Sequence, residues 1–146
     1  MQWSAIVPVK ASTNAKSRLQ TNAAWRSELS RAFLSDALQA LAACDQIERI
    51  IVVTDDSELR TLLDPVIELK EISSIGLNED IGIGLKILDH TPVAVITGDL
   101  PCLTKDAIDI VLELASSFER SFVSDSQGIG TTMLLAHNAA NCTPLF

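Results

Sequence analysis

VAVITGDLP, residues 93–101, carries the clearest pattern in the chain: an apolar run that ends in a small polar turn. A continuous apolar run, in place of an alternating one, is typical of a strand that is buried on both faces. Ligands of sheets built from such strands bind beyond the carboxyl ends of the strands. Asp99 lies at that end, where a carboxylate can hold a divalent cation against a phosphate, although it could also simply brace its turn.

Similar segments extend in both directions from this run, and apolar spacing assigns each one to a strand or a helix. Predicted strands cover residues 4–9, 50–54, 66–69, 93–97, 122–123 and 132–136. Predicted helices cover residues 25–43, a short stretch through Leu63, residues 78–89, and a segment capped by Thr104 that runs to about residue 116. The alternation implies an α/β fold with three layers, in which helices cover both faces of a mostly parallel sheet. We expect a single domain spanning residues 1–146.

Composition excludes several classes of function. The chain is 47% hydrophobic and 21% charged, which suits a globular core, and its formal net charge is −8. Such a charge argues against binding nucleic acid or an anionic membrane, so any phosphate site must be local. The three cysteines are widely spaced and form no CxxC pair, which predicts a reducing, cytoplasmic location without zinc. We recognise no secretory signal and no apolar run near the roughly 18 residues that span a bilayer.

Charged residues follow several predicted strands and should meet at one edge of the sheet. Lys10, Asp55, Asp99 and Asp125 each follow a predicted strand. The loop over residues 10–18 holds three cations, Lys10, Lys16 and Arg18, which could surround a triphosphate or could be scattered charges in solvent. The loop matches neither GxxxxGK[ST] nor GxGxxG. Asp55 and Asp56 are expected to cap the helix that follows them.

Glycines mark two further segments. In GLN, residues 76–78, the asparagine is either the N-cap of a helix or a group that reads a base by donating and accepting hydrogen bonds. Gly82 and Gly84 lie inside the predicted helix, where each costs about 1 kcal/mol relative to alanine, so close packing against a ligand or a strand is expected. GIGTT, residues 128–132, suits either an anionic acceptor or an ordinary turn.

Taken in order, VPVK at 7–10, AKSRL at 15–19, GLN at 76–78, DLPCLT at 99–104 and GIGTT at 128–132 resemble the 2-phospho-L-lactate guanylyltransferase family. The resemblance spans nearly the whole chain. It implies a nucleotide-diphospho-sugar transferase (GT-A-like) fold. It also implies transfer of GMP from GTP to 2-phospho-L-lactate, phosphoenolpyruvate or phosphoglycerate, with release of pyrophosphate, in coenzyme F-420 biosynthesis.

Carried over by position, the resemblance implies magnesium as the cofactor, with Asp99 as its ligand, and GTP and a small phosphorylated acid as partners. Whether the chain forms a homodimer is left open. Family members continue beyond the position of Phe146, so we expect a C-terminally incomplete chain that binds GTP better than it turns it over. The implied roles are catalytic for Lys10, Lys16 and Asp99, nucleotide-binding for Pro8, Val9, Lys10, Lys16, Arg18, Gly76 and Asn78, and substrate-binding for Thr131 and Thr132.

Two alternatives compete with this interpretation. One is another GT-A-like nucleotidyltransferase, of the sugar-phosphate or molybdenum-cofactor type, against which the missing LxAGGxSxRMG-like signature counts. The other is a noncatalytic module that binds a nucleotide without transferring it.

Overall fold

The computed structural model describes residues 1–11 and 23–146, and its centre is a six-stranded sheet in the order β3-β2-β1-β4-β6-β5. The strands are β1 Trp3–Val9, β2 Ile47–Thr54, β3 Glu68–Glu71, β4 Val93–Ile96, β5 Arg120–Ser124 and β6 Thr131–Ala136. The helices are α1 Ala23–Ala42, α2 Leu59–Leu62, α3 Leu77–Leu88 and α4 Lys105–Ala115, with a 3₁₀ turn, η1, at Ala139–Asn141. These elements confirm the predicted alternation of strands and helices.

The first four strands run parallel, and β6 pairs antiparallel with both of its neighbours, β4 and β5. The sheet is therefore mostly parallel, as predicted, and β6 is the exception. A short turn joins β5 to β6, and a connection of that length can only reverse the chain direction. As a result, the carboxyl ends of β1, β2, β4 and β5 lie at the same edge of the sheet as the amino end of β6.

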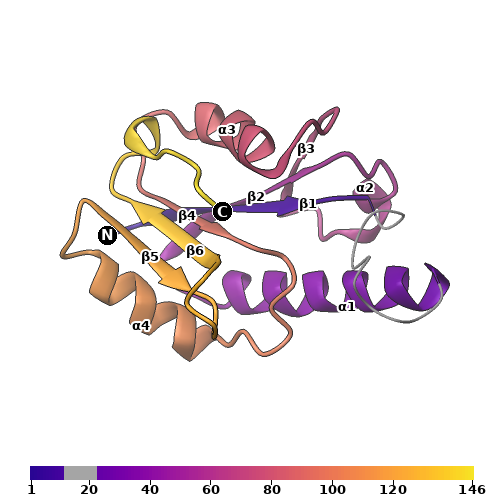
Figure 1. The fold of residues 1–146 in the computed structure, drawn as a ribbon, viewed down its shortest axis with the longest axis horizontal. Helices are drawn as coiled ribbons and strands as arrows, with labels where there is room; N and C mark the ends of the chain where they lie inside the picture. Colours follow the sequence, from indigo (N-terminus) through magenta and orange to yellow (C-terminus); the bar gives the residue numbers. More distant parts are fainter. Residues whose placement is uncertain (12–22) are drawn as a thin grey trace.

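Helices cover both faces of the sheet, as Figure 1 shows: α1 and α4 lie below it, and α3 and η1 lie above. The four residues of β4 divide between the two layers. Ala94 and Ile96 pack into the core on the α1 and α4 face, whereas Val93 and Val95 pack into the core on the α3 face. This two-sided burial is the physical reason why the strand reads as a continuous apolar run.

The third strand lies two residues later than predicted, at Glu68–Glu71 in place of 66–69. Asp64 holds the preceding residues in a turn, because its carboxylate accepts from the N–H of Val66 and its carbonyl accepts from the N–H of Ile67. Pairing with β2 therefore begins only at Glu68, and Val66 is 74% exposed. Apolar residues alone could not reveal this turn.

Helix α3 lies unusually close to the sheet at Gly84. A Cβ atom built there would lie 3.0 Å from Cγ2 of Val53 and 3.1 Å from Cγ2 of Ile6. The sequence left open whether Gly84 packs against a ligand or a strand, and the structure shows that it packs against strands. Gly82, by contrast, meets no atom of the described chain within 4 Å of a Cβ position.

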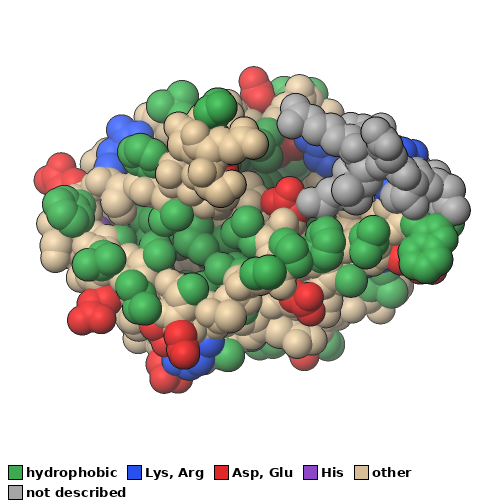
Figure 2. Space-filling view, turned by 60° about the horizontal axis from the view of Figure 1, so that its bottom comes forward, with side chains coloured by type: hydrophobic (Ala, Val, Ile, Leu, Met, Phe, Trp, Pro, Cys, Tyr) green, Lys and Arg blue, Asp and Glu red, His purple; other side chains and the backbone are tan. Residues whose placement is uncertain are grey.

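Helix α4 begins as predicted, since Thr104 Oγ1 accepts from the N–H of Ala107 at 3.2 Å. Figure 2 shows apolar side chains gathered on the face that α1, α4 and β5 form. Ile110 of α4 and Phe122 of β5 are among the exposed large apolar residues of the described chain. Within residues 1–11 and 23–146, we find no helix that is long and apolar enough to cross a bilayer.

Candidate active site

A cavity of about 260 Å³ lies at the carboxyl ends of β1 and β4. It brings Pro8, Val9 and Lys10, from the end of β1, together with Asp99, from the turn after β4. These residues are far apart in the sequence, and their assembly at one cavity is what a shared ligand requires. The full lining is Pro8, Val9, Lys10, Ser30, Leu34, Leu77, Thr97, Gly98 and Asp99.

The position of the cavity follows from the strand pairing. β1 pairs with β4 only as far as Ile6 opposite Val95, whereas it continues to pair with β2 as far as Val9 opposite Thr54. Lys10 lies four residues after Ile6, and Asp99 lies four residues after Val95. The chain leaves β1 toward β2 on one side and returns to β4 on the other, so this is the point of the sheet where α/β folds bind ligands.

Gly98 lets helix α1 lie directly against the turn that carries Asp99. A Cβ atom at Gly98 would lie 3.2 Å from Cδ1 of Leu34 on α1 and 3.3 Å from Cγ1 of Val7 on β1. Contacts this short require the neighbours to move, so a side chain at this position would shift the Asp99 turn. Sequence reasoning did not single out this glycine.

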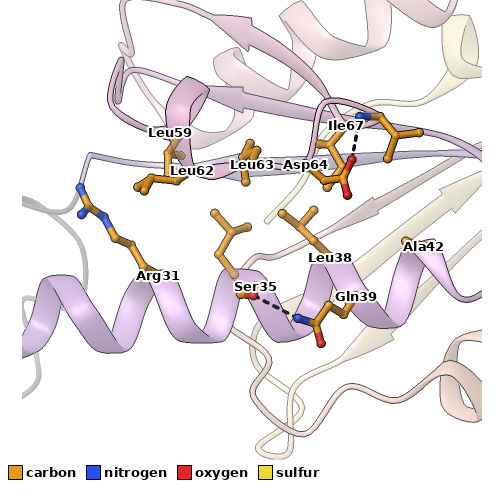
Figure 3. A pocket seen from close by; sticks show the side chains of 12 residues that line it. Arg31, Ser35, Leu38, Gln39, Ala42, Leu59, Leu62, Leu63, Asp64 and Ile67 are labelled. Carbon is orange, nitrogen blue, oxygen red and sulfur yellow. Dashed lines mark hydrogen bonds between the residues drawn. The ribbon is translucent and has the colours of Figure 1, made fainter.

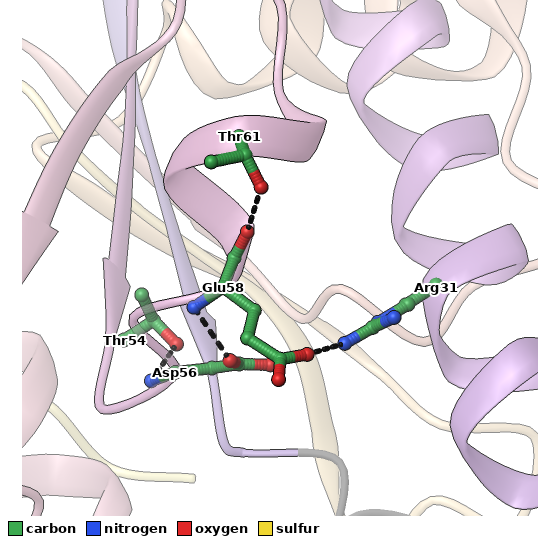
Figure 4. Close-up of polar contacts among 5 residues, drawn as sticks. All are labelled: Arg31, Thr54, Asp56, Glu58 and Thr61. Atoms are coloured by element: carbon green, nitrogen blue, oxygen red, sulfur yellow. Dashed lines mark hydrogen bonds and ion pairs between the residues drawn. The ribbon is translucent and has the colours of Figure 1, made fainter. Parts of the chain in front are cut away.

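Asp55 does not cap the helix after it, which corrects the sequence expectation. Its Oδ1 accepts from the N–H of Ala11 at 2.7 Å, so the end of β2 holds the chain directly after Lys10. Asp56 does not cap α2 either, because the N-cap is Glu58 and no side chain caps the helix there. The Oδ1 of Asp56 instead accepts from the N–H of Glu58 at 3.0 Å, in the turn before the helix, as Figure 4 shows. Glu58 in turn pairs with Arg31 of α1 at 2.5 Å. Arg31 is therefore already neutralised by an acid.

Gly76 and Asn78 lie beside the cavity and do not line it, although Leu77 between them does. Gly76 is the N-cap of α3, so the interpretation of Asn78 as N-cap is wrong. The Oδ1 of Asn78 accepts from the backbone N–H of Phe146 at 3.1 Å. Because that N–H can only donate, the contact fixes which end of the amide is the oxygen.

Asp80 is a buried acid near the site that sequence reasoning missed. It is 5% exposed, its Oδ2 accepts from the hydroxyl of Ser74 at 2.5 Å, and its Oδ1 accepts from the N–H of Ile75 at 3.4 Å. These contacts fix the approach of the chain to Gly76 and α3. An acidic residue in the first turn of a helix was the available signal.

Thr131 and Thr132 begin β6 at the same edge of the sheet, but Thr132 faces a different cavity. That cavity measures about 360 Å³, is mainly apolar, and includes Leu100, Cys102 and Met133 in its lining. The hydroxyl of Thr132 donates to the carbonyl of Val123 at 3.1 Å. Asp99 lines the cavity of Lys10, whereas the residues that follow it, from Leu100, line that of Thr132.

Asp125 also lies at this edge, but its carboxylate is used within the β5–β6 turn. It accepts from the N–H groups of Gln127, Ile129 and Gly130 at 3.1, 3.0 and 3.0 Å. Hydrogen bonds to the charged form, with that from Ile129 the largest cause, lower the pKa of Asp125 below its ordinary value. This residue organises the turn, and no ligand is needed to explain it.

Asp125→Asn should lower the melting temperature at pH 7, because three N–H groups lose an ionised acceptor. A carboxyl group whose pKa is lowered by folding stabilises the protein above its ordinary pKa of about 3.9, and this contribution is lost as the pH falls further. The difference in melting temperature between wild type and variant should therefore shrink as the pH drops below about 4. A constant difference between pH 7 and pH 3 would contradict this account of the turn.

A third cavity, of about 250 Å³, lies between α1 and the segment that contains α2, as Figure 3 shows. Its floor is made of apolar residues such as Leu38, Leu59 and Leu63, and Arg31 and Asp64 lie at its rim. Leu34 belongs to this cavity as well as to that of Lys10 and Asp99. Of the described residues predicted to bind a nucleotide, none lines this cavity.

The metal-binding capacity of the described residues is small. Within residues 1–11 and 23–146, no group of three or more His, Cys, Asp and Glu side chains could hold an ion. Magnesium commonly binds to proteins through one or two carboxylates and completes its shell with substrate phosphates and water. Asp99 at the cavity fits that mode. The predictions for Lys16 and Arg18 fall outside the described residues.

Solved structures show the same fold. A candidate nucleotide-diphospho-sugar transferase from Desulfovibrio desulfuricans G20 matches with a TM-score of 0.77 and 17% identity, over 98% of this chain and 67% of that one. A 4-diphosphocytidyl-2C-methyl-D-erythritol synthase from Anaerococcus prevotii matches with a TM-score of 0.63 and 15% identity, over 95% of this chain and 70% of that one. The predicted nucleotide-diphospho-sugar transferase fold is thereby confirmed.

Sequence comparison gives closer relatives. The chain is 36% identical to the phosphoenolpyruvate guanylyltransferase of Streptomyces coelicolor, over its whole length and 73% of that protein. It is 40% identical to phosphoenolpyruvate guanylyltransferase 2 of Rhodococcus jostii, over 95% of its length and 65% of that protein. The family model for CofC-like guanylyl transferases matches residues 3–142. The chain therefore belongs to the CofC-like guanylyl transferase family, which confirms the expectation of a nucleotidyltransferase.

Proposed function

We propose that the chain transfers GMP from GTP to a phosphorylated three-carbon acid, with phosphoenolpyruvate as the first candidate, and releases pyrophosphate. The observation that carries the proposal is the assembly of Lys10 and Asp99 at one cavity at the carboxyl edge of the sheet. Relatives named phosphoenolpyruvate guanylyltransferase support the choice of acceptor. The product would be a precursor of coenzyme F-420.

In the proposed reaction, a phosphate oxygen of the acceptor attacks the α-phosphorus of GTP. A new P–O–P linkage forms as the bond between the α-phosphorus and the bridging oxygen breaks, and pyrophosphate leaves with that oxygen. Lys10, at the end of β1, neutralises charge on the triphosphate. Asp99 would hold magnesium, which supplies further charge neutralisation on the phosphates when it is bound.

The remaining roles in the proposal follow from the resemblance. Lys16 and Arg18 bind phosphate oxygens, Gly76 and Asn78 contact the guanine nucleotide, and Thr131 or Thr132 contacts the acceptor acid. The contact of Asn78 with Phe146 leaves its amide NH₂ group as the donor for a base. A cytoplasmic location agrees with the three cysteines, all of which have free thiols. A homodimer is also compatible with the proposal.

Incubation of the protein with GTP and magnesium tests the reaction. Phosphoenolpyruvate, 2-phospho-L-lactate and phosphoglycerate are supplied in separate reactions, and released pyrophosphate is measured together with the mass of the product. We expect pyrophosphate with at least one acid, and a product whose mass equals that of the acid plus a GMP residue. ATP and CTP in place of GTP are the controls for the base.

Absence of pyrophosphate with every acid, together with absence of GTP binding, would contradict the proposal. Binding of GTP without release of pyrophosphate would support the nucleotide site and argue for the noncatalytic module that the sequence left as an alternative. The two results are separated by titrating GTP in a calorimeter under the conditions of the assay.

A further inference from the structure

Helix α1 contributes to the cavity of Lys10 and Asp99 through Ser30 and Leu34. These two residues are four positions apart, so they lie on the same side of the helix. Leu34 contacts the Asp99 turn closely, since its Cδ1 lies 3.2 Å from the Cβ position of Gly98. Ser30 is thus held at the lining by a helix that the turn itself fixes in place.

The hydroxyl of Ser30 lacks a partner in the described part of the protein. Its Oγ is excluded from solvent, and no donor or acceptor of the described residues bonds to it. Four other side-chain atoms share this condition there: Trp3 Nε1, Ser4 Oγ, Arg31 Nε and Ser121 Oγ. Of the five, only Ser30 belongs to a residue that lines the cavity of Lys10 and Asp99.

An unsatisfied buried hydroxyl costs free energy that a bonded one does not, and folded proteins retain few of them. When such a group belongs to a residue that lines a ligand cavity, the ligand is a natural source of the missing bond. Serine moves among staggered χ1 rotamers, so its hydroxyl can reach an oxygen in the cavity that its side chain lines.

We propose that Ser30 is a nucleotide-binding residue, whose hydroxyl donates a hydrogen bond to a phosphoryl oxygen of the triphosphate. This inference rests on the proposed function. A phosphate is favoured over the base because the charged groups at this cavity, Lys10 and Asp99, are those that suit a phosphate with its cation. A phosphoryl oxygen accepts hydrogen bonds and cannot donate them when ionised, which matches a hydroxyl donor.

Ser30→Ala tests the proposal, with GTP and inorganic tripolyphosphate as probes, each supplied with magnesium. We expect the dissociation constants of both probes to rise by about tenfold to a hundredfold, as for the loss of one hydrogen bond to a charged group. We also expect the melting temperature of the free protein to stay level or to rise. Alanine removes the unpaired hydroxyl and favours the helix more than serine does.

Ser121→Ala is the matched control. It removes another unpaired hydroxyl from β5, outside the lining of the cavity, and should leave the affinity for both probes unchanged. Equal losses of affinity in the two variants would overturn the assignment, because they would reflect a general effect of removing a buried hydroxyl.

The remaining outcomes separate this proposal from the proposed function. If wild type binds both probes and Ser30→Ala binds them as tightly, Ser30 has no role in binding and the nucleotide site stands. If Ser30→Ala weakens GTP but not tripolyphosphate, the hydroxyl contacts the nucleoside, and the phosphate assignment is wrong. If wild type binds neither probe, the proposed function itself fails.

Discussion

Asp99→Asn is expected to lower the rate of GMP transfer by about 10²- to 10³-fold, the range seen when one group that stabilises developing charge is removed. Asparagine preserves the shape of the side chain at the cavity but loses the negative charge that a magnesium ion needs. The affinity of the variant for GTP should therefore no longer increase when magnesium is added. Pyrophosphate release gives the rate, and GTP titrations in magnesium and in EDTA give the metal dependence.

Asp106→Asn is the matched control for this experiment. Asp106 is an exposed acid in the first turn of α4, and it does not belong to the cavity lining. Its replacement changes the net charge by the same amount and should alter neither the rate nor the metal dependence by more than about twofold, since an exposed charge contributes little. If GTP binding by Asp99→Asn still depended on magnesium, Asp99 would not be the magnesium ligand.

Gly84→Leu is expected to destabilise the fold by about 1 to 3 kcal/mol, the range for overpacking a filled core. A Cβ atom at this position already lies 3.0 to 3.2 Å from side-chain atoms of Val53 and Ile6, so a larger side chain must push α3 away from β1 and β2. Urea unfolding followed by far-UV circular dichroism measures the loss in the free energy of unfolding.

Gly82→Ala, two residues away on the same helix, provides the opposite expectation. Because no described atom lies within 4 Å of its Cβ position, alanine can enter without displacing a neighbour. It should stabilise the helix by about 1 kcal/mol through its higher helix propensity. If leucine at 84 were tolerated as well as alanine at 82, the close contact of α3 with the sheet would be wrong.

The sequence predicted the fold most accurately where a local pattern follows directly from burial. The strand at Val93–Ile96 is buried on both faces, as its continuous apolar run indicated. The cap at Thr104 was likewise visible, because a capping hydroxyl needs only its own backbone neighbours. The direction of β6 relative to β5 follows from the short connection between them, which can only reverse the chain. The place of β6 beside β4 was less accessible, since no local pattern indicates which strand a buried strand pairs with.

The site was predictable in part. Lys10 and Asp99 could be predicted because each follows a strand. Strands β1 and β4 are neighbours in the sheet, so the two residues meet at one cavity at the predicted edge. Contacts over long sequence separation were not visible in advance. The bond of Asp55 to Ala11 joins residues 44 apart, and that of Asn78 to Phe146 joins residues 68 apart. Local spacing carries no information about such partners.

The arrangement of cavities adds a constraint that the motifs alone did not contain. Thr132 lines a mainly apolar cavity together with Leu100, whereas Lys10 and Asp99 line another cavity. The structure therefore does not bring the residue predicted to bind the acceptor acid into the cavity of the residues predicted to bind phosphate and metal.

The most direct test of the central claim is a double-mutant cycle on the affinity for GTP with magnesium, using Lys10→Met, Asp99→Asn and the combined variant. If both side chains act on one bound triphosphate, each single change should weaken binding. The loss in the combined variant should then differ from the sum of the single losses by about 1 kcal/mol or more, as for residues that share a partner. Strictly additive losses, or a single variant that binds as tightly as wild type, would contradict a shared ligand at this cavity.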